Sequence, residues 1–395
     1  MTRFVIRRGA GARTGALVLA VAGAVVACQV VAGIDRVPKE APDAAPASDG
    51  SVPANDPCPH VLAPDPPATD DAKDEEIPPF YLALRNVSLT PQNADLSYIG
   101  LDLDTVCTCD RRAGTAHAGQ TSCVPKQEVC DGDGGADNRA ASLFQQFTLT
   151  GAPSVNDGIV DDIAQGNSTL LIWIAGWNGK PNDREIKVGA LVSTGITDSS
   201  GCGVTTSDDA THFHPGWCGH DKWNFAPSTT ITVGGKVAPL GNGIGYVTNS
   251  QLVYKSESAI NVALGRAEVA FNSPTTMGTL TSDANGYKLS GILGGRIEIG
   301  QLLGAVGQFK VGAAPKVDLC NDDKDFTGIK AVLCDAVDIA RTSVFDFQNA
   351  ACDAISSAMQ FTAEPAEIGA EVAGKPNDSP CSPDLDANKA KYVCP

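Results

Sequence analysis

The chain has 395 residues, of which 43% are hydrophobic and only 19% are charged. Its formal net charge is −17, and an acidic surface of this kind repels both the phosphates of nucleic acids and anionic lipid headgroups. We therefore expect no nucleic-acid partner. The 41 Gly and 25 Pro favour many turns and short elements over long helices.

The first 28 residues have the pattern of an export signal. Four arginines in residues 3–13 precede an apolar stretch, residues 15–27, which is too short to span a bilayer by itself. The stretch ends in Val25-Val26-Ala27-Cys28, which resembles the lipobox of bacterial lipoproteins. The resemblance implies cleavage before Cys28 and attachment of lipid, such as palmitate, to its sulfur. An ordinary secretory signal and an uncleaved N-terminal anchor helix are the alternatives.

The residues after Cys28 refine this expectation. Residues 28–37 resemble the start of many envelope lipoproteins of the myxobacterial type, and the body matches no characterised family that we recognise. Gln29 stands where Asp often signals retention in the inner membrane, so we expect a cell-envelope protein, lipid-anchored on the outer membrane. Residues 38–79 are rich in Pro, Ala and Asp and lack apolar periodicity, which predicts a disordered or extended tether.

The cysteine count agrees with lipid attachment, because 13 is odd. Setting Cys28 aside leaves an even number, and an exported chain meets an oxidising compartment, so disulfides are expected. The remaining cysteines are Cys58, Cys107, Cys109, Cys123, Cys130, Cys202, Cys218, Cys320, Cys334, Cys352, Cys381 and Cys394. Locality groups them within 107–130, 202–218 and 320–394, and Cys58 should tie the tether to the body. A zinc site in 107–130 is the rival interpretation, although its spacing matches no standard zinc finger.

Short strands dominate the middle of the chain. Residues 81–89 and 98–106 alternate apolar and polar side chains, and the second of these places Asp102 and Asp104 on its polar face. The continuous apolar run 169–175 predicts a buried strand, which should form a hairpin with 185–194. Further short strands follow up to residue 299. This pattern predicts a mainly β fold, namely a β-sandwich of the jelly-roll or laminin-G and lectin-like kind.

Helical spacing appears at 138–147 and again near the C-terminus. Residues 297–306 favour a helix, and apolar residues three or four apart predict two more helices in 326–340 and 347–359. We therefore expect a small, disulfide-stapled helical unit. The predicted organisation is a signal peptide at 1–27, a tether at 28–79, a β-sandwich at 80–312 and the helical unit at 313–395.

One acidic turn is a candidate calcium site. Asp131, Asp133 and Asp137 are spaced on a Gly-rich segment such that alternate carboxylates could point inward. Ca²⁺ prefers six to eight oxygen ligands of this kind. The segment lacks the distal Glu of an EF-hand, and the alternative is an Asp-rich surface turn that leads into the next helix.

A His-rich loop is a second candidate metal site. His212, His214 and His220 are three of the five histidines of the chain, and three imidazoles leave an open position on zinc or copper. The competing interpretation is a surface loop that is closed by a Cys202–Cys218 disulfide.

Two tryptophans on predicted loops are candidate ligand-binding residues. Trp177 and Trp217 could stack on sugar rings of a glycan, or they could simply pack against the body. Trp173 lies in the predicted buried strand and is expected in the core.

No standard catalytic motif, such as GxSxG, HExxH or a P-loop, occurs in the sequence. We therefore expect a non-enzymatic binding or structural module on a lipid tether, with a glycan or protein ligand. The alternative is a metal-dependent or carboxylate hydrolase of extracellular polymers, since glycosidase carboxylates leave no local motif. A calcium-stabilised component of an envelope assembly is a third hypothesis.

Overall fold

The structure is a computed structural model, and it describes residues 58–71, 77–92, 98–109, 121–127, 129–149, 154–205, 213–227, 229–233, 236–264, 267–311, 317–373, 381 and 389–395. The predicted signal peptide, Cys28, residues 28–57 of the tether and His212 lie outside these residues.

Strands make up most of the regular structure, as predicted from the sequence. They are β1 (Phe80–Ser88), β2 (Leu170–Ala175), β3 (Asp183–Asp198), β4 (Lys222–Phe225), β5 (Thr230–Val233), β6 (Lys236–Pro239), β7 (Gly243–Thr248), β8 (Gln251–Lys255), β9 (Ile260–Leu264), β10 (Ala267–Asp283), β11 (Gly286–Glu298), β12 (Lys310–Val311), β13 (Val317–Asp318) and β14 (Ala354–Glu371). The α-helices are α2 (Arg139–Leu149), α3 (Val155–Ala164), α4 (Ile299–Gly307) and α5 (Asp323–Asp335). Short 3-10 turns are η1 (Ser200–Cys202), η2 (Leu319–Asn321), η3 (Ser343–Phe345) and η4 (Lys389–Tyr392).

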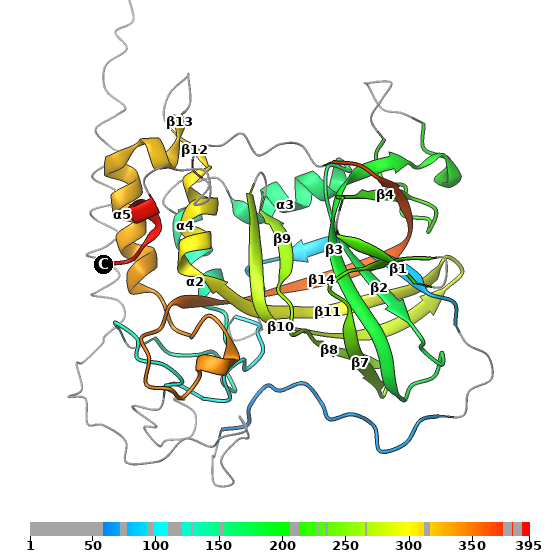
Figure 1. The fold of residues 1–395 in the computed structure, drawn as a ribbon, viewed down its shortest axis with the longest axis horizontal. Coiled ribbons are helices and arrows are strands. Elements are labelled where there is room, and N and C mark those ends of the chain that lie inside the picture. The colour runs from blue at the N-terminus through cyan, green and yellow to red at the C-terminus, as the bar shows by residue number, and fades with distance from the viewer. Residues whose placement is uncertain are drawn as a thin grey trace, which may run out of the picture.

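The main sheet closes on itself (Figure 1). Its strands pair antiparallel in the order β1-β2-β3-β7-β8-β10-β11-β14, and β14 then pairs with β1. Strand β4 lies between the far ends of β3 and β14 and is parallel to β14. The mainly β prediction is thus confirmed, whereas the pairings form one continuous ring instead of the two facing sheets that a sandwich requires.

Alternation along β1 explains how the sheet separates two cores. Leu82 and Leu84 belong to the large core, which also takes in the apolar faces of the helices. Tyr81 and Ala83 point to the other side, where they pack in a second cluster with Trp173 of β2. The second cluster is completed by Trp223 and Phe225 of β4 and by Ala238 of β6. A strand buried on both faces needs apolar residues at nearly every position, which matches the apolar run that predicted β2.

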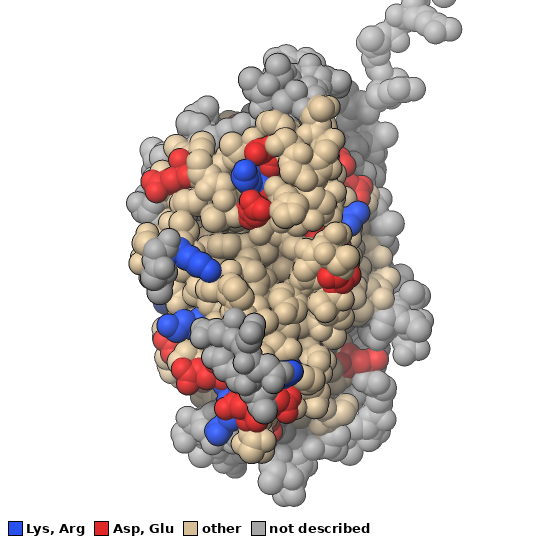
Figure 2. All heavy atoms as spheres, turned by 90° about the vertical axis from the view of Figure 1, so that its right-hand side faces the viewer, with Lys and Arg blue, Asp and Glu red and all other residues tan. Residues whose placement is uncertain are grey.

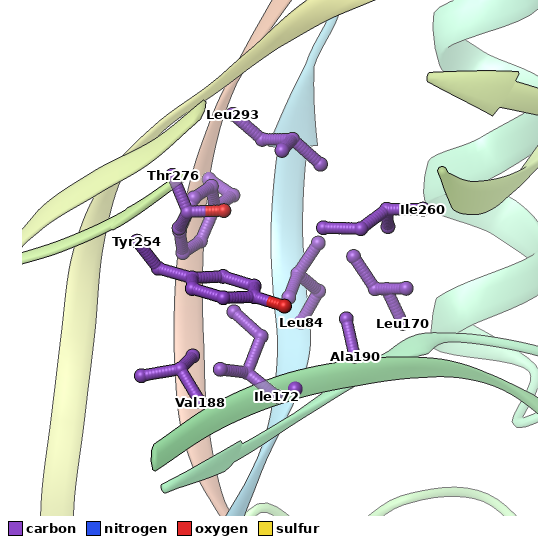
Figure 3. A pocket seen from close by; sticks show the side chains of 11 residues that line it. Leu84, Leu170, Ile172, Val188, Ala190, Tyr254, Ile260, Thr276 and Leu293 are labelled. Carbon is purple, nitrogen blue, oxygen red and sulfur yellow. The ribbon is translucent and has the colours of Figure 1, made fainter. Parts of the chain in front are cut away.

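Side chains largely fill the space enclosed by the sheet. The cavity drawn in Figure 3 measures about 10 Å³ and is lined by Leu84, Ile172, Tyr254, Leu293 and other apolar residues. That volume is about the size of one water molecule. In this conformation the cavity therefore has no room for an organic ligand.

The C-terminal segment differs from its prediction. Helix α5 forms where a helix was expected, and α4 packs against it at one end of the sheet (Figure 1). The second predicted helix, 347–359, is wrong, because its residues from 354 onward belong to β14, which pairs with both β1 and β11. Ile355, Met359 and Phe361 do face one core, but β14 runs through the sheet, and the spacing of four residues also fits the even steps of a strand.

Six disulfides join the twelve cysteines that the structure describes. The pairs are Cys58–Cys107, Cys109–Cys130, Cys123–Cys352, Cys202–Cys218, Cys320–Cys381 and Cys334–Cys394. They confirm the predicted disulfides, the closed 202–218 loop and the link from the tether to the body. Cys123–Cys352 spans 229 residues and joins the cysteine-rich segment 107–130 to the residues just before β14, a pairing that locality does not predict.

Across the described ranges, no helix is both long and apolar enough to cross a membrane.

Candidate cation site

Two loops converge to form a buried acidic cluster below the sheet. The backbone N–H of Asp137 donates to the carbonyl of Leu101 at 2.9 Å, which pairs the loop before α2 with the segment after β1. This pairing brings together Asp102, Asp104 and Asp137, whose carboxylate oxygens lie within 4.8 Å of one another. Each of these residues is at least 94% buried. Three carboxylates this close in a buried site are a natural oxygen ligand set for a hard cation.

Hydrogen bonds from the surrounding loop fix each carboxylate. Thr105 N donates to Asp102 Oδ1 at 2.6 Å, and Leu103 N donates to Asp137 Oδ2 at 2.7 Å. Asp104 accepts from Val106 N at 3.0 Å and from Ser122 Oγ at 2.5 Å. The cluster is therefore held in place by the fold, since these donors come from the same short loop and from the adjoining cysteine segment.

Burial and mutual repulsion favour the protonated forms of these groups. Burial, together with the charge of Asp104, raises the pKa of Asp102 to about 7. Burial raises the pKa of Asp104, and burial followed by the charge of Asp104 holds the pKa of Asp137 well above its ordinary value. Asp131, whose Oδ2 accepts from Thr108 N at 2.6 Å, has its pKa raised well above the ordinary value by the same two causes. A bound divalent cation would reverse this preference, because it stabilises the charged carboxylates.

The buried arginine near the cluster is already engaged by another acid. Arg296 of β11 pairs with Asp346 through two hydrogen bonds, and its Nη2 also donates to the carbonyl of Leu103 at 2.6 Å. It therefore fastens the acidic loop to the sheet, while most of its charge is balanced by Asp346. Arg296 therefore leaves the charge of the cluster largely uncompensated when its carboxylates are ionised, and a divalent cation would supply the missing positive charge.

The structure places the three sequence-predicted calcium ligands differently. Asp137 is in the cluster, and Asp131 is close enough to affect its electrostatics. Asp133 is only half-buried and is not part of the three-carboxylate group. Asp102 and Asp104 complete the group, although the alternating pattern had placed them on an exposed strand face. That prediction was wrong, because residues 98–106 form a loop with single bridges at residues 98 and 101. The only sequence signal was a pair of alternate aspartates directly before two cysteines.

The His-rich loop does not assemble a metal site from its described residues. His212 lies outside them, and His220 is exposed, with its Nδ1 2.9 Å from Glu367 Oε1. In the residues that the structure covers, neither His214 nor His220 joins a group of three neighbouring metal ligands. The expected closing disulfide, Cys202–Cys218, is present.

The tryptophans have mixed outcomes. Trp173 is in a core, as predicted. Trp177 is 94% buried against Tyr287 and donates from its Nε1 to the carbonyl of Lys180, as the packing alternative predicted. Trp217 is half-buried beside Trp223, and the guanidinium of Arg85 lies 5.5 Å from its ring centre.

The zinc alternative for residues 107–130 is wrong for the structure described, because all four cysteine sulfurs of that segment are in disulfides.

Comparison with known proteins gives no relative. No family model, no curated protein and no solved structure matches this chain.

Proposed function

We propose that the chain is an exported, non-enzymatic lipoprotein that lipid on Cys28 holds on the outer membrane of a bacterial cell envelope. The observation that carries the proposal is the pairing of all twelve described cysteines. Such a network requires an oxidising compartment, and it leaves Cys28 as the one cysteine of the sequence without a disulfide assignment. Lipid attachment at the lipobox would account for this remaining cysteine.

The positions of the disulfides also suit a tethered body. Cys58–Cys107 fastens the end of the tether, and residues 58–71 then run along the outside of the body to Asp71, whose backbone N–H donates to the carbonyl of Asn182 (Figure 1). A pull on the lipid end would therefore be borne by a covalent bond and would not peel the first strand from the sheet. Residues 28–57 supply a spacer of up to roughly 100 Å when fully extended.

The body supports a binding or structural role better than a catalytic one. The cavity described inside the sheet, about 10 Å³ in volume, is too small for an organic ligand, and the candidate cation site is buried. The face in Figure 2 has charges of both signs around a largely uncharged centre, which suits contact with an uncharged glycan or a protein surface. A metal-dependent or carboxylate hydrolase of extracellular polymers remains the alternative, and its metal-dependent form would need the His-rich loop to bind a metal.

The lipid anchor is tested with a Cys28→Ser variant in a bacterial host that processes lipoproteins. We expect the parent protein in the membrane fraction with incorporated labelled palmitate, and the variant without label and no longer held by lipid. Val31→Ala, three residues away, is the matched control and should behave as the parent does. A Cys28→Ser protein that still incorporates palmitate would refute the proposal.

We further propose that Ca²⁺ stabilises the body at Asp102, Asp104 and Asp137, which the buried carboxylate group favours. Calorimetric titration of the untagged mature protein should give one binding event. Extracellular calcium modules bind in the range of about 10⁻⁴–10⁻³ M, so an absence of heat at millimolar Ca²⁺ would end this part of the proposal.

A further inference from the structure

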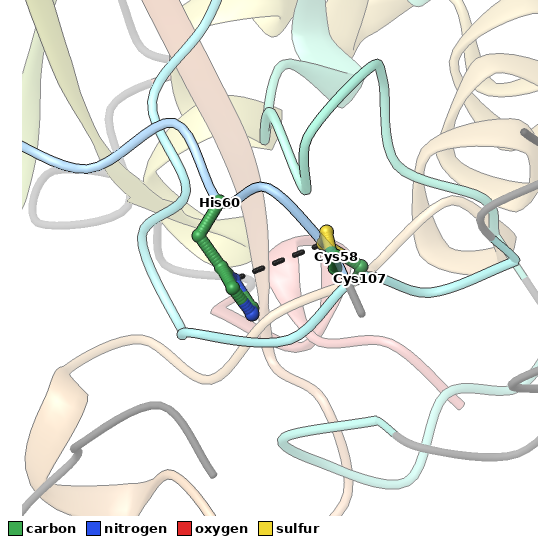
Figure 4. Close-up of side chains that lie close together, drawn as sticks. All are labelled: Cys58, His60 and Cys107. Carbon is green, nitrogen blue, oxygen red and sulfur yellow. Dashed lines mark hydrogen bonds between the residues drawn. A yellow bond between two sulfur atoms is a disulfide. The ribbon is translucent and has the colours of Figure 1, made fainter. Parts of the chain in front are cut away.

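A histidine lies directly beside the disulfide that fastens the tether. His60 Nδ1 is 3.8 Å from Cys107 Sγ, and the ligand atoms of Cys58, His60 and Cys107 all lie within 4.8 Å of one another (Figure 4). The His60 side chain is 95% buried. An imidazole that accompanies two sulfurs in a buried site is a ligand set for zinc.

The nitrogen-to-sulfur spacing fits a tetrahedral zinc site, whereas the two sulfurs, which the disulfide holds together, would have to separate to about 3.8 Å. Zinc bonds of about 2.3 Å to sulfur and about 2.0 Å to nitrogen place those two ligand atoms about 3.5 Å apart. The observed separation of 3.8 Å is close to this value. Asp102 Oδ2 lies 2.5 Å from His60 Nδ1 and could supply the fourth ligand after a small rotation.

The backbone holds His60 at this site independently of the disulfide. Its φ is +30°, a left-handed conformation that is unfavourable for residues other than Gly. The next residue, Val61, donates to the carbonyl of Gly134 at 2.7 Å and accepts from Asp102 N at 3.0 Å. A side chain at Gly135 would come within 2.9 Å of both Asp102 Oδ2 and Cys107 Sγ, so only Gly leaves the site open. Opening the disulfide would therefore leave most of the site in place.

We propose that reduction of Cys58–Cys107 converts this corner into a Zn²⁺ site with Cys58, His60, Cys107 and Asp102 as ligands. Two equivalents of a thiol reductant, RSH, break the disulfide and become RSSR, and the two sulfurs gain two electrons and two protons. Zn²⁺ then replaces the two thiol protons, which are released to solvent. Reoxidation by a disulfide reverses both steps and expels the metal.

The proposed zinc ligands differ from the proposed calcium ligands, although Asp102 belongs to both sets. The neighbouring carboxylates Asp104 and Asp137 add negative potential that favours any divalent cation. Oxidised protein would offer the carboxylates and the His60 imidazole in this region, whereas reduced protein would add two thiolates. The redox state of one disulfide thus selects between a hard and a soft cation.

The test uses the full mature protein and Co²⁺ as a spectroscopic substitute for Zn²⁺. A phosphine reductant is titrated without denaturant. Alkylation with mass spectrometry of one portion identifies the opened cysteines, and Co²⁺ is added to a second portion that has not been alkylated. We expect Cys58 and Cys107 to become alkylatable and a sulfur-to-cobalt charge-transfer band to appear with tetrahedral visible bands. Excess Zn²⁺ should remove these bands, and oxidised protein should show none. A pair that resists reduction in the folded protein, or a reduced pair that gives no band, would overturn the proposal.

Variants assign the ligands. His60→Gln retains both cysteines and should weaken Co²⁺ binding at least about tenfold. A Cys202→Ser/Cys218→Ser double variant removes a disulfide that also has nearby histidines, and it should leave the band unchanged. Asp104→Asn should weaken calcium binding and preserve the cobalt band, so failure of the calcium proposal and failure of this one are separable. Unaltered Co²⁺ affinity in His60→Gln would show that His60 is not a ligand.

Discussion

Arg296 and Asp346 form a buried ion pair in which both guanidinium Nη atoms donate to the carboxylate. Nη1 lies 2.7 Å from Oδ1 and Nη2 lies 2.6 Å from Oδ2, and the two side chains are 1% and 8% exposed. The same guanidinium also donates to the carbonyls of Leu103 and Ala340. One side chain of β11 therefore holds both the acidic loop that contains Leu103 and the segment that contains Ala340.

Replacing Arg296 should destabilise the whole body. In Arg296→Met the Asp346 carboxylate stays buried without its partner, and loss of one partner of a buried pair typically costs about 3–5 kcal/mol. The free energy of unfolding in urea measures the effect. The matched control is Arg85→Met, whose ion pair with Glu364 is 44% exposed on the arginine side and should cost below about 1 kcal/mol. Equal losses in the two variants would contradict the assigned role of Arg296.

Asp137→Asn should separate calcium binding from stability. The amide oxygen can still accept from Leu103 N, while one ligand charge is removed, so Ca²⁺ affinity should fall at least about tenfold. In the absence of calcium the variant should be more stable than the parent, because the amide avoids the cost of burying a carboxyl group as a charge or of keeping it protonated above its ordinary pKa. Calorimetry and thermal unfolding in a chelator measure the two effects. Asp133→Asn is the control, and if it weakened calcium binding as strongly, the assignment of the ligands would be wrong.

Without calcium, stability should fall as the pH rises. Burial raises the pKa of Asp102 to about 7 and that of Asp338 to about 6, so the folded state keeps protons that the unfolded state has lost above about pH 4. The unfolding free energy therefore decreases as the pH rises from about 4 through about 7. Urea midpoints across this range in a chelator measure the slope. Saturating Ca²⁺ should flatten or reverse it, and a chelated protein that gains stability with rising pH would refute the prediction.

Trp177 should matter for stability and Trp217 much less. Trp177→Ala removes a buried ring from a cluster with Phe80 and Tyr287, and such truncations cost about 3–5 kcal/mol. Trp217→Ala removes a half-buried ring, so its effect on stability should be smaller. Urea unfolding compares the two. If glycans do bind the body, an array should show the loss with Trp217→Ala only, and loss of binding in a folded Trp177→Phe variant would reverse this assignment.

The spacing of apolar residues in the sequence predicted those strands and helices whose buried side chains recur at regular intervals. Strands β2 and β3 and helices α2, α4 and α5 formed near their expected positions, because apolar spacing reports directly on the face that is buried. The same reasoning failed for β14, since Ile355 and Met359 are four residues apart and that spacing suits a helix turn as well as a strand face. Its partners β1 and β11 are distant in sequence, so only the tertiary pairing decides between the two.

Only part of the candidate cation site could be predicted from the sequence. The Gly-rich turn predicted Asp131 and Asp137 as ligands, whereas the alternating pattern placed Asp102 and Asp104 on the polar face of a strand. Their burial depends on the bridge between Leu101 and Asp137, which is a contact between two loops without regular periodicity. Only Cys58 lies near His60 in the sequence. The other residues of the site, Cys107 and Asp102, are more than forty residues away, so the local pattern did not single out His60.

The mass of the mature protein, purified from membranes without reductant, is the most direct test of the lipoprotein account. We expect an N-terminus at an acylated Cys28, and a mass short by the two hydrogens lost at each of six disulfides, with no alkylatable thiol. A chain that begins at Met1, or an unmodified Cys28 with a free thiol, would contradict the account.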